Sequence, residues 1–555
     1  MRLRTRLYLV VMCCLLSVSL GAQEQTIRFG SPFDFPLKLS ASFGELRSGH
    51  LHGGLDIKTE GVVGKPIHSI ADGYISRATV SYGGFGQAVY VTHPNGLISV
   101  YGHIQRFSPK VAKAVDDYQY ANERFLADLH FEADQFPVKK GDIIAWSGNE
   151  GYSFGPHLHM ELHNSETGER VDPMPYFKNK ILDTTPPRAT TIYFYPQKGE
   201  GVVEGSFNKH SVPVTELQKP VNAWGKIALG ISANDYMDGT HNNYGVKYVT
   251  LLLDTVKIFQ STVSAYTSLD NQMINAWTDY HEQQVHNRWV MRSHRLPGNK
   301  LGFLEAVEDG YLTIDEEKDY RFTYILQDGH GNKTSYRFTI HGTPCEIAPV
   351  NTQGREYLSY DRMNLLLEPG MQLVIPKGAL YEDAIVRPKV WNDSAAISHT
   401  YELNDHPIAL NMGCPLMIGV RNMVDEDTTK YYIARIVKGK LASAGGKYEN
   451  GWVKTSIREF GTYTVAIDTI PPTITPRNKK QWTSGNISFN IGDSGTGLKT
   501  YRVELDGQFE LFGFNAKSAV LSMKHPERVK RGVRHELKVM LEDYAGNKRE
   551  ETYTL

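Results

Sequence analysis

Between Phe29 and about Lys180 the chain alternates apolar and polar residues in short runs, which glycine-rich turns separate. The stretch GKPIHSIADGYISRATVSYGGFGQAVYVTHPNGLISVYGHI is typical of this part. Successive side chains of a strand point to opposite faces, so an alternation of period two predicts half-buried strands joined by tight turns. We therefore expect an antiparallel β-sheet unit here.

One stretch interrupts this alternation. Residues 108–136, SPKVAKAVDDYQYANERFLADLHFEADQF, contain no glycine and only one proline, which stands near the start. Most of the other residues favour helix. Because strand-rich sequence precedes and follows this stretch, we predict a helical insertion within the unit rather than a linker.

Beyond residue 180 the sequence repeats itself, which predicts two copies of one β-sandwich. DTTPPRAT, starting at Asp183, returns as DTIPPTIT at Asp468. Asp235, GVKYVTLLLD and LQDGHGNKTSYRFTI follow the first copy, and Asp493, GLKTYRVELD and LEDYAGNKREETYTL follow the second. The paired prolines suit an extended entry, and DGHGN and DYAGN supply turn residues. The expected topology is immunoglobulin-like, which carries no activity by itself.

The length of 555 residues fits several separately cored units, and 31 Tyr and 50 Gly favour strands and turns. We predict a mainly β protein in which an antiparallel β-sheet domain with a helical insertion precedes three β-sandwiches of immunoglobulin-like type. The expected division is a signal peptide at 1–21, the first domain at 22–180, and β-sandwiches at 181–343, 344–467 and 468–555.

The first 21 residues have the pattern of a secretory signal. Three arginines precede an apolar run from Leu7 to Leu20, and small residues end it. The run of about 14 residues is short for a bilayer span, which needs about 20. We expect an exported protein, soluble after signal removal, in the periplasm, the cell envelope or the extracellular space. Of the cysteines beyond the signal, Cys345 and Cys414 allow one disulfide or two free thiols.

Formal net charge is −1, so the chain lacks the concentrated basic field that nucleic acids or anionic membranes require. We expect neither as a partner.

Two patches of the first unit place ionisable side chains on one strand face. In GHLHGGLDIK the adjacent glycines argue against a helix, and in an extended strand His52 and Asp56 project to the same side. In GPHLHMEL the residues His157, His159 and Glu161 share one face. A third patch, SVYGHI, ends a predicted strand with a histidine.

Taken singly, each patch is a weak signal, since a chain with 20 histidines contains a His-x-His pair by chance on the order of once. Together they match a hydrolytic zinc site, which needs about three ligands and an open position for water. His52, Asp56 and one of His157 and His159 supply that set, and strand parity leaves open which one. The remaining histidine can take a proton from water or stabilise an oxyanion. We expect one Zn²⁺ per chain and no other cofactor.

These motifs resemble a known family. HGGLDIK, GKPIHSIADGYI, GGFGQAVYVTHPNG, VYGHI, VKKGDIIAWSGNEG and SFGPHLHMEL stand in the order found in lysostaphin and LytM-type zinc metallopeptidases of bacterial cell walls. The resemblance covers roughly residues 45–175. It implies that His52, Asp56 and His159 are the zinc ligands, and that His103 and His157 are catalytic histidines that orient the attacking water and stabilise the transition state.

The resemblance implies an exported zinc metalloendopeptidase that hydrolyses peptide bonds in peptidoglycan stem or cross-link peptides. The alternative is a non-catalytic envelope protein that uses the same fold to bind peptidoglycan or a partner wall enzyme. Binding-only relatives typically lose ligands, whereas this sequence keeps all five residues. We also expect an envelope protein partner for the C-terminal sandwiches or for the insertion at 108–136.

The chain departs from the family pattern at two places. The insertion lies near an expected groove wall, where it could narrow the groove, gate it or recruit a partner. Phe154 stands where a smaller residue is commoner.

Four further residues, three histidines and one glutamate, lie near these motifs in the sequence. We expect His50 to face solvent and His93 and His163 to be structural. Glu161 is either a hydrogen-bond partner of a metal-bound imidazole or a structural residue.

Overall fold

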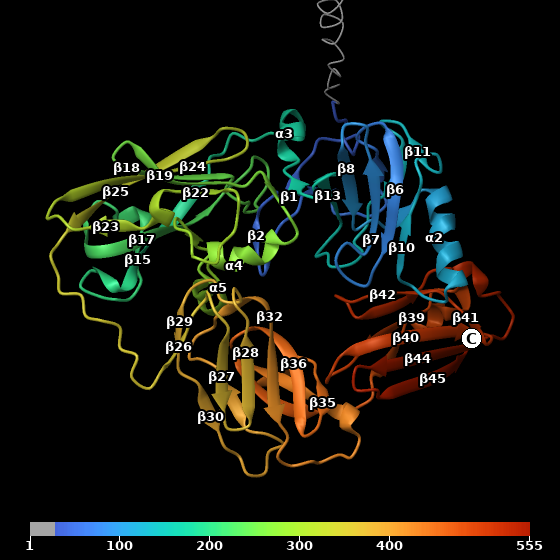
Figure 1. Ribbon diagram of the computed structural model, residues 1–555. Helices are drawn as coiled ribbons and strands as arrows, with labels where there is room; N and C mark the ends of the chain where they lie inside the picture. The colour runs from blue at the N-terminus through green and yellow to red at the C-terminus, as the bar shows by residue number, and fades with distance from the viewer. Residues whose placement is uncertain (1–27) are drawn as a thin grey trace, which may run out of the picture.

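The protein is described by a computed structural model over residues 28–555, so the predicted signal peptide lies outside the described residues. Four units follow one another, and each has its own cluster of buried apolar side chains. They are the N-terminal unit (28–180), the second unit (181–343), the third unit (344–467) and the C-terminal unit (468–555). Strands dominate all four, which confirms the mainly β fold. Figure 1 shows a ring in which the C-terminal unit, in red, returns to the N-terminal unit, in blue.

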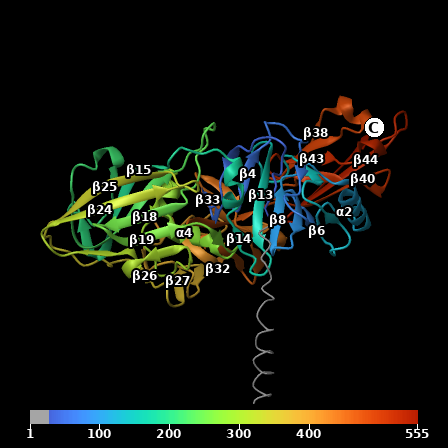
Figure 2. The same cartoon turned by 90° about the horizontal axis from the view of Figure 1, so that it is seen from above.

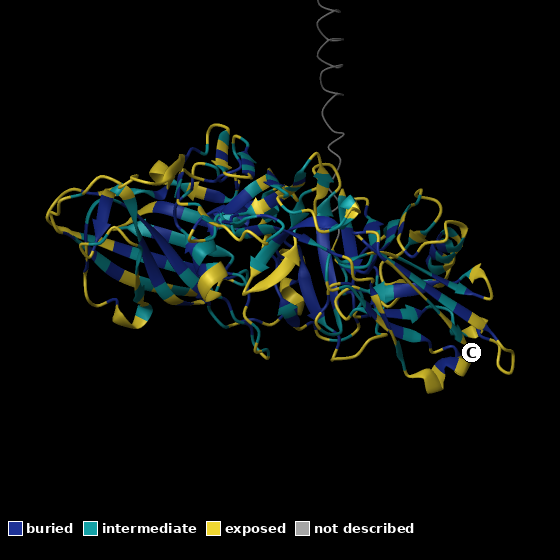
Figure 3. Cartoon of the chain, turned by 90° about the horizontal axis from the view of Figure 1, so that it is seen from below, coloured by how far each residue is buried: buried dark blue, intermediate teal, exposed yellow. Residues whose placement is uncertain are grey.

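The N-terminal unit is an antiparallel sheet protein with two helices. Its strands are β1 (Leu39–Ala41), β2 (Leu46–Arg47), β3 (His50–Leu51), β4 (Leu55–Lys58), β5 (Pro66–His68), β6 (Gly73–Val80), β7 (Gln87–Thr92), β8 (Leu97–Gly102), β9 (Arg106–Phe107), β10 (Ala127–His130), β11 (Pro137–Val138), β12 (Ile143–Trp146), β13 (His157–Asn164) and β14 (Arg170–Val171), and its helices are α2 (Pro109–Ala121) and α3 (Met174–Phe177). The main sheet follows the order β1-β4-β13-β8-β7-β6-β10, and a smaller sheet has the order β5-β12-β9. In Figure 3 the central strands are dark blue, because their apolar side chains are buried.

The helical prediction for residues 108–136 is correct only for its first half. Helix α2 ends at Ala121, and β10 then pairs antiparallel with β6 at the edge of the main sheet. In β10 the alternate residues Ala127 and Leu129 pack with the core, while Asp128 and His130 are exposed. Pairing with a sheet edge and burial of one face therefore outweighed the helix propensity of this segment.

The second unit is built on long strands. It contains β15 (Arg188–Val203), β16 (His210–Pro213), β17 (Val221–Asn234), β18 (Tyr248–Leu253), β19 (Val256–Thr262), β20 (Ala265–Tyr266), β21 (Met291–Arg292), β22 (Leu304–Ala306), β23 (Leu312–Ile314), β24 (Asp319–Gln327), β25 (Lys333–Gly342), α4 (Ile274–Trp277) and α5 (Tyr280–His286). Their order is β16-β15-β17-β25-β24-β18-β19-β22. Strand β20 pairs with β14, so the N-terminal sheet continues into the second unit.

The third unit contains two five-stranded sheets with a common core. Its strands are β26 (Glu356–Leu358), β27 (Asn364–Glu368), β28 (Met371–Ile375), β29 (Ala384–Val386), β30 (Lys389–Trp391), β31 (Thr400–Glu402), β32 (Ala409–Gly419), β33 (Tyr431–Val437), β34 (Lys440–Ser443), β35 (Lys447–Glu449), β36 (Trp452–Glu459) and β37 (Thr462–Ile467). The sheets have the orders β27-β28-β32-β36-β35 and β30-β31-β37-β33-β34.

The C-terminal unit contains two four-stranded sheets around one core. Its strands are β38 (Thr473–Arg477), β39 (Ser488–Gly492), β40 (Leu498–Leu505), β41 (Gln508–Phe509), β42 (Phe512–Asn515), β43 (Val520–Met523), β44 (Glu536–Asp543) and β45 (Lys548–Thr554). The sequence repeat has a structural counterpart: β18, β24 and β25 pair in the second unit as β40, β44 and β45 pair here. Immunoglobulin-like topology stays a prediction.

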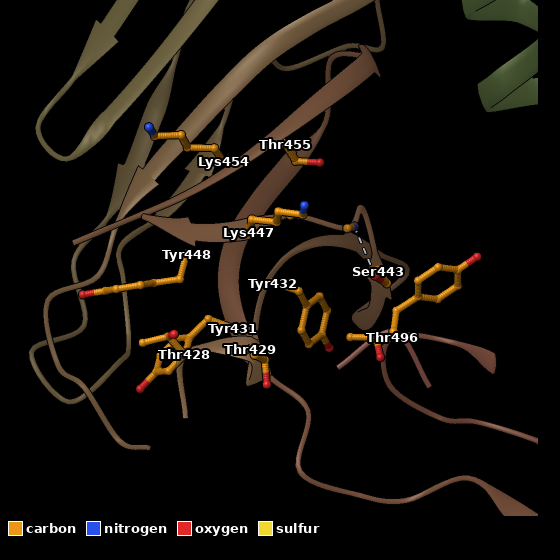
Figure 4. Close-up of a pocket in the computed structure, with 13 residues that line it drawn as sticks. Thr428, Thr429, Tyr431, Tyr432, Ser443, Lys447, Tyr448, Lys454, Thr455 and Thr496 are labelled. Atoms are coloured by element: carbon orange, nitrogen blue, oxygen red, sulfur yellow. Dashed lines mark hydrogen bonds between the residues drawn. The ribbon is translucent and has the colours of Figure 1, made fainter. Parts of the chain in front are cut away.

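A cavity of about 750 Å³ lies where the third and C-terminal units meet (Figure 4). Hydroxyl groups and two lysines, Lys447 and Lys454, line it, and Thr496 and Tyr544 close it from the C-terminal unit. It lies in other units than the histidine patches of the sequence and shares no residue with them.

The C-terminal unit docks on α2 and on the loop before β13, as Figures 1 and 2 show. The hydroxyl of Tyr120 donates to Glu510 Oε1 at 2.8 Å, and the Lys517 ammonium lies 3.5 Å from the centre of the Phe154 ring. The unusual Phe154 is therefore a contact with the C-terminal unit. Helix α2, the first half of the predicted insertion, therefore forms part of the interface with the C-terminal unit.

Cys345 and Cys414 are both free. Within residues 28–555 no helix has the length and apolar character needed to cross a bilayer.

Candidate metal centre

Three strands of the main sheet bring the sequence patches together. Antiparallel pairing of β4 with β13 sets Asp56 directly opposite His159. Pairing of β13 with β8 sets His159 opposite Gly102, so His103 follows at the end of the neighbouring strand. The backbone of His103 has φ +59°, an uncommon left-handed conformation that turns the chain at this point. Sheet register thus gathers residues that are far apart in the sequence.

The route that brings His52 to the site differs from the predicted single strand. His52 lies between β3 and β4, so strand parity does not explain how it meets Asp56. Instead, the hairpin of β2 and β3 packs into the core of the second unit through Leu51. The hydroxyl of Tyr266 donates to the carbonyl of Leu51 at 2.9 Å, and Asn271 Oδ1 accepts from its N–H at 3.3 Å. The second unit therefore holds the segment that carries His52.

The two glycines of HGGLD allow this segment to lie against β13. A Cβ atom on Gly54 would lie 2.1 Å from the carbonyl oxygen of Met160, and one on Gly53 would lie 2.2 Å from a carboxylate oxygen of Glu161. Close approach of the backbone to its neighbours, rather than turn geometry, therefore requires glycine at both positions.

Three ligand atoms form a small triangle at the centre of the site. Asp56 Oδ1 lies 3.0 Å from His52 Nε2 and 2.7 Å from His159 Nδ1, and the two nitrogens are 3.0 Å apart. All three residues are buried. Ligands of a tetrahedral ion with bonds of about 2.0–2.1 Å lie about 3.3 Å apart, so slight expansion of this triangle fits zinc.

The protonation of these groups explains how the triangle holds together. His52 Nδ1 donates to the carbonyl of Ser42 at 2.7 Å, and burial lowers the pKa of His52, so Nε2 presents a lone pair. Burial alone would lower the pKa of His159, but hydrogen bonds to Asp56 and Glu161 raise it to about 9. Burial opposes ionisation of Asp56, yet its contacts with His52 and the other imidazoles hold its pKa well below the usual range. A proton on His159 Nδ1 thus bridges two acceptors, and a metal cation would replace it.

Glu161 anchors the far side of the His159 ring. Its buried carboxylate accepts from His159 Nε2 at 2.9 Å, from His163 Nε2 at 2.5 Å and from Arg170 Nε at 3.1 Å. Burial raises the pKa of Glu161, but these donors hold it well below its ordinary value. This geometry supports the role of a hydrogen-bond partner that orients a metal-binding imidazole.

Two further imidazoles flank the triangle. The Nδ1 atoms of His103 and His157 donate to the carbonyls of Glu150 and Gly155, each at 2.8 Å. The centres of the two rings are 4.8 Å apart, and His157 Nε2 lies 3.5 Å from Asp56 Oδ1. Burial, together with the adjacent imidazoles, lowers the pKa of His103 to about 3. His103 is therefore neutral and carries its free lone pair on Nε2, and the Nδ1 contact of His157 likewise leaves its Nε2 turned toward the triangle.

The sequence did not indicate Arg47, whose Nη2 donates to Asp56 Oδ2 at 3.1 Å. This contact occupies the carboxylate oxygen outside the triangle and leaves Oδ1 toward the nitrogens. No motif marks Arg47, because a hairpin held by another unit brings it to the site. Among the neighbours, His50 is exposed, and the Nε2 of His93 bonds to Ser99 Oγ inside the unit.

Two imidazole nitrogens and one carboxylate oxygen, with two further imidazoles beside them, form a candidate site for one metal ion with a ligand set suited to hydrolysis. The comparisons agree with this class. The model of Peptidase family M23 matches residues 50–121, and that of the Zu5-like domain matches residues 355–468. The N-terminal unit therefore carries a Peptidase family M23 domain of the LytM and lysostaphin type, which confirms the resemblance seen in the sequence.

Curated relatives match the same part of the chain. Glycyl-glycine endopeptidase ALE-1 of Staphylococcus capitis is 32% identical over 165 residues, which are 28% of this chain and 39% of that protein. An uncharacterized metalloprotease of Haemophilus influenzae is 30% identical over 151 residues, 27% of this chain and 25% of the relative. DD-carboxypeptidase/endopeptidase Mpg of Neisseria meningitidis serogroup B is 29% identical over 147 residues, 26% of each. The chain thus spans less than half the length of these relatives.

Among solved structures, the catalytic domain of the antimicrobial peptidase lysostaphin from Staphylococcus simulans is 26% identical. The match covers 26% of this chain and 92% of that domain, with a TM-score of 0.20.

Proposed function

We propose that the protein is a zinc-dependent metalloendopeptidase that hydrolyses peptide bonds in peptidoglycan stem or cross-link peptides. The observation that carries the proposal is the triangle of His52 Nε2, Asp56 Oδ1 and His159 Nδ1, with the lone pairs of two further imidazoles beside it. One Zn²⁺ would be held by these three residues. When bound, it supplies Lewis acidity that activates water for attack on an amide carbonyl.

The residues of the chain divide the remaining work. Glu161 fixes the tautomer and orientation of His159, and Arg47 orients the Asp56 carboxylate. The Nδ1 contacts of His103 and His157 orient both rings and leave each Nε2 free of them, so either Nε2 can take a proton from water. After that transfer the imidazolium can donate a hydrogen bond to the oxyanion or a proton to the leaving amine.

The choice of peptidoglycan rests on the relatives. Two of them are named as a glycyl-glycine endopeptidase and a DD-carboxypeptidase/endopeptidase. Export follows from the signal pattern at residues 1–21, and it would bring the protein to this substrate. Fusing residues 1–21 to a reporter that is active only after export tests this part separately.

Digestion of purified peptidoglycan tests the activity. The zinc-loaded full chain is expected to release peptide fragments that mass spectrometry identifies. His159→Ala, which removes a ligand, is expected to release none and to lose zinc. His130→Ala changes an exposed histidine of the same unit and is expected to behave as the wild type.

The outcome that contradicts the proposal is also defined. If zinc-loaded wild type releases nothing that His159→Ala does not, the chain is not a peptidoglycan hydrolase. Co-sedimentation of the inactive protein with peptidoglycan would then favour the binding function.

A further inference from the structure

The sequence repeat places three aspartates together at the start of each repeated unit. Asp183, Asp235 and Asp328 form one cluster, and their oxygens lie within 4.8 Å of one another. Asp468, Asp493 and Asp543 form the corresponding cluster of the C-terminal unit. In each copy the first aspartate precedes the Pro-Pro pair, and the second lies further along the unit. The third begins the last turn, DGHGN or DYAGN. The metal centre of the N-terminal unit uses none of these residues.

The first cluster is buried at the junction of the N-terminal and second units. Asp183, Asp235 and Asp328 are 7%, 3% and 1% exposed. Asp183 lies in the connecting segment, Asp235 follows β17 and Asp328 follows β24. Three acidic side chains from separate parts of the chain therefore share one interior site.

Two carboxylate oxygens of this cluster have no hydrogen-bond partner. They are Asp183 Oδ2 and Asp235 Oδ1, and both are inaccessible to solvent. Burying an unpaired polar atom costs about 1–3 kcal/mol, and more for a charged one, so such atoms in a native protein indicate a missing partner. Burial raises the pKa of Asp235 to about 8 and that of Asp183 to about 6, and the neighbouring carboxylates add to this effect.

Within residues 28–555 no lysine or arginine forms an ion pair with these three aspartates. The one basic side chain nearby is His330, whose Nδ1 lies 3.4 Å from Asp183 Oδ2. Its Nε2 donates to the carbonyl of Ile181 at 3.0 Å, so a neutral ring turns a lone pair toward the carboxylate. Even a charged His330 would pair with only one of the three acidic side chains.

The third aspartate is already fixed in place. Asp328 Oδ1 accepts from the backbone N–H groups of His330, Gly331 and Asn332 at 2.6–2.9 Å. The amide of Asn332 donates to Asp328 Oδ2 at 2.7 Å and to the carbonyl of Asp183 at 3.2 Å. These bonds hold the carboxyl group of Asp328 in place and tie the connecting segment to the turn after β24.

The C-terminal cluster repeats this frame with more internal partners. Asn547 donates to Asp543 Oδ2 at 2.8 Å and to the carbonyl of Asp468 at 2.9 Å, as Asn332 does in the first cluster. Thr496 donates to Asp468, and Asp493 accepts from two backbone N–H groups. The repeat thus preserves the arrangement: in the C-terminal copy one interior oxygen, Asp493 Oδ1, has no hydrogen-bond partner, and in the first copy two interior oxygens have none.

We propose that Asp183, Asp235 and Asp328 bind one Ca²⁺, which joins the connecting segment to the ends of β17 and β24. Calcium prefers oxygen ligands at 2.3–2.6 Å, and two such ligands on opposite sides of the ion lie about 5 Å apart, which accommodates this cluster. The ion supplies the positive charge that the surrounding side chains lack. It also fixes the position of the second unit, which holds the segment that carries His52.

Calcium binding by the full chain tests the proposal independently of peptidase activity. Equilibrium dialysis with radioactive calcium, at one equivalent of zinc, counts the ions bound between about 10 µM and 10 mM, a range that includes the dissociation constants of about 10⁻⁴–10⁻³ M typical of extracellular calcium modules. Wild type is expected to bind with a Kd of about 10⁻³ M or tighter. Asp235→Asn, and separately Asp183→Asn, should each bind one ion fewer. Asp315→Asn alters an exposed aspartate of the same unit and should bind as many as wild type.

Thermal unfolding gives a second readout. Calcium at 10 mM is expected to raise the melting temperature of the second unit by about 3–10 °C in wild type and not in Asp235→Asn. Without calcium, Asp235→Asn should melt above wild type, because a neutral amide avoids the cost of burying an acidic group beside two other carboxyl groups. Unchanged stoichiometry in both folded variants, or absence of saturable binding in wild type, would overturn the proposal. An equal shift with 10 mM magnesium would overturn the assignment to calcium.

Discussion

Glu161→Gln is the sharpest test of how the metal centre is held. The substitution keeps the size of the side chain but removes its charge and one of its acceptor oxygens. Three donors from His159, His163 and Arg170 converge on this carboxylate, which is 3% exposed. An amide has one oxygen and one NH₂ group, so at least one donor then faces another donor.

The loss is expected to appear in zinc affinity. Removing such a partner of a metal-bound histidine typically weakens metal binding about 10–100-fold, or about 1.4–2.7 kcal/mol. Protons compete with zinc for His159, so the pH dependence of zinc affinity gives a second test. Because the pKa of His159 is raised to about 9, its proton is bound in the metal-free protein below that pH and lost above it. Wild-type zinc affinity should therefore rise about tenfold per pH unit up to about pH 9 and then level off.

In Glu161→Gln one of the two groups that raise the pKa of His159 is lost. The rise of zinc affinity with pH should then end at a lower pH than in wild type. Competition with a chromophoric chelator at several pH values between 6.5 and 9.5 measures both the affinity and this end point.

Glu166→Gln serves as the control, since Glu166 is exposed and its side chain makes no contact with the site. Folding of each variant is checked by circular dichroism. The reasoning is refuted if folded Glu161→Gln binds zinc as tightly as wild type above pH 9, or if its pH profile does not move.

Three further predictions concern other parts of the site. His103→Ala should retain one zinc per chain but lower kcat about 10²–10⁴-fold, and loss of the metal instead would assign His103 to the ligands. Gly54→Ala should destabilise the protein by about 1–3 kcal/mol or more in urea unfolding, since its Cβ would clash with the backbone of β13, whereas Gly155→Ala meets no atom within 4 Å and should be neutral. A double-mutant cycle of Phe154→Ala and Lys517→Ala should give a coupling of about 0.5–1 kcal/mol for the exposed cation–π pair, and additivity would show that the contact does not help the C-terminal unit to dock.

Much of the candidate site could be predicted because short sequence motifs contain its chemically active residues. Alternation predicted the strands that carry Asp56 and His159, and the order of the motifs selected His159 over His157 as the ligand. The structure brings His52, Asp56 and His159 within hydrogen-bond distance of one another. Alternation of side chains along one strand was enough to place His157 and His159 on the same face of β13, because that strand is regular over its whole length.

The alternation of side chains did not predict the position of His52 correctly, because contacts between units decide the path of the chain there. His52 and Arg47 reach the site through a hairpin that packs into the second unit, and no local pattern encodes that packing. The second half of the predicted helical insertion became β10 for a similar reason, since an edge strand of the main sheet was available to pair with it.

The sequence by itself thus predicted the mainly β fold, the repeat and the five residues proposed for the metal site, because period, motif order and residue chemistry are local properties. The tertiary structure decided which unit supports His52, that Phe154 contacts the C-terminal unit, and that Asp183, Asp235 and Asp328 share one buried site. These features depend on contacts between segments that lie about 50 to 360 residues apart in the sequence. Burial matters because an acidic side chain that is well solvated in an exposed turn loses that solvation in the interior, where a bound cation can replace it.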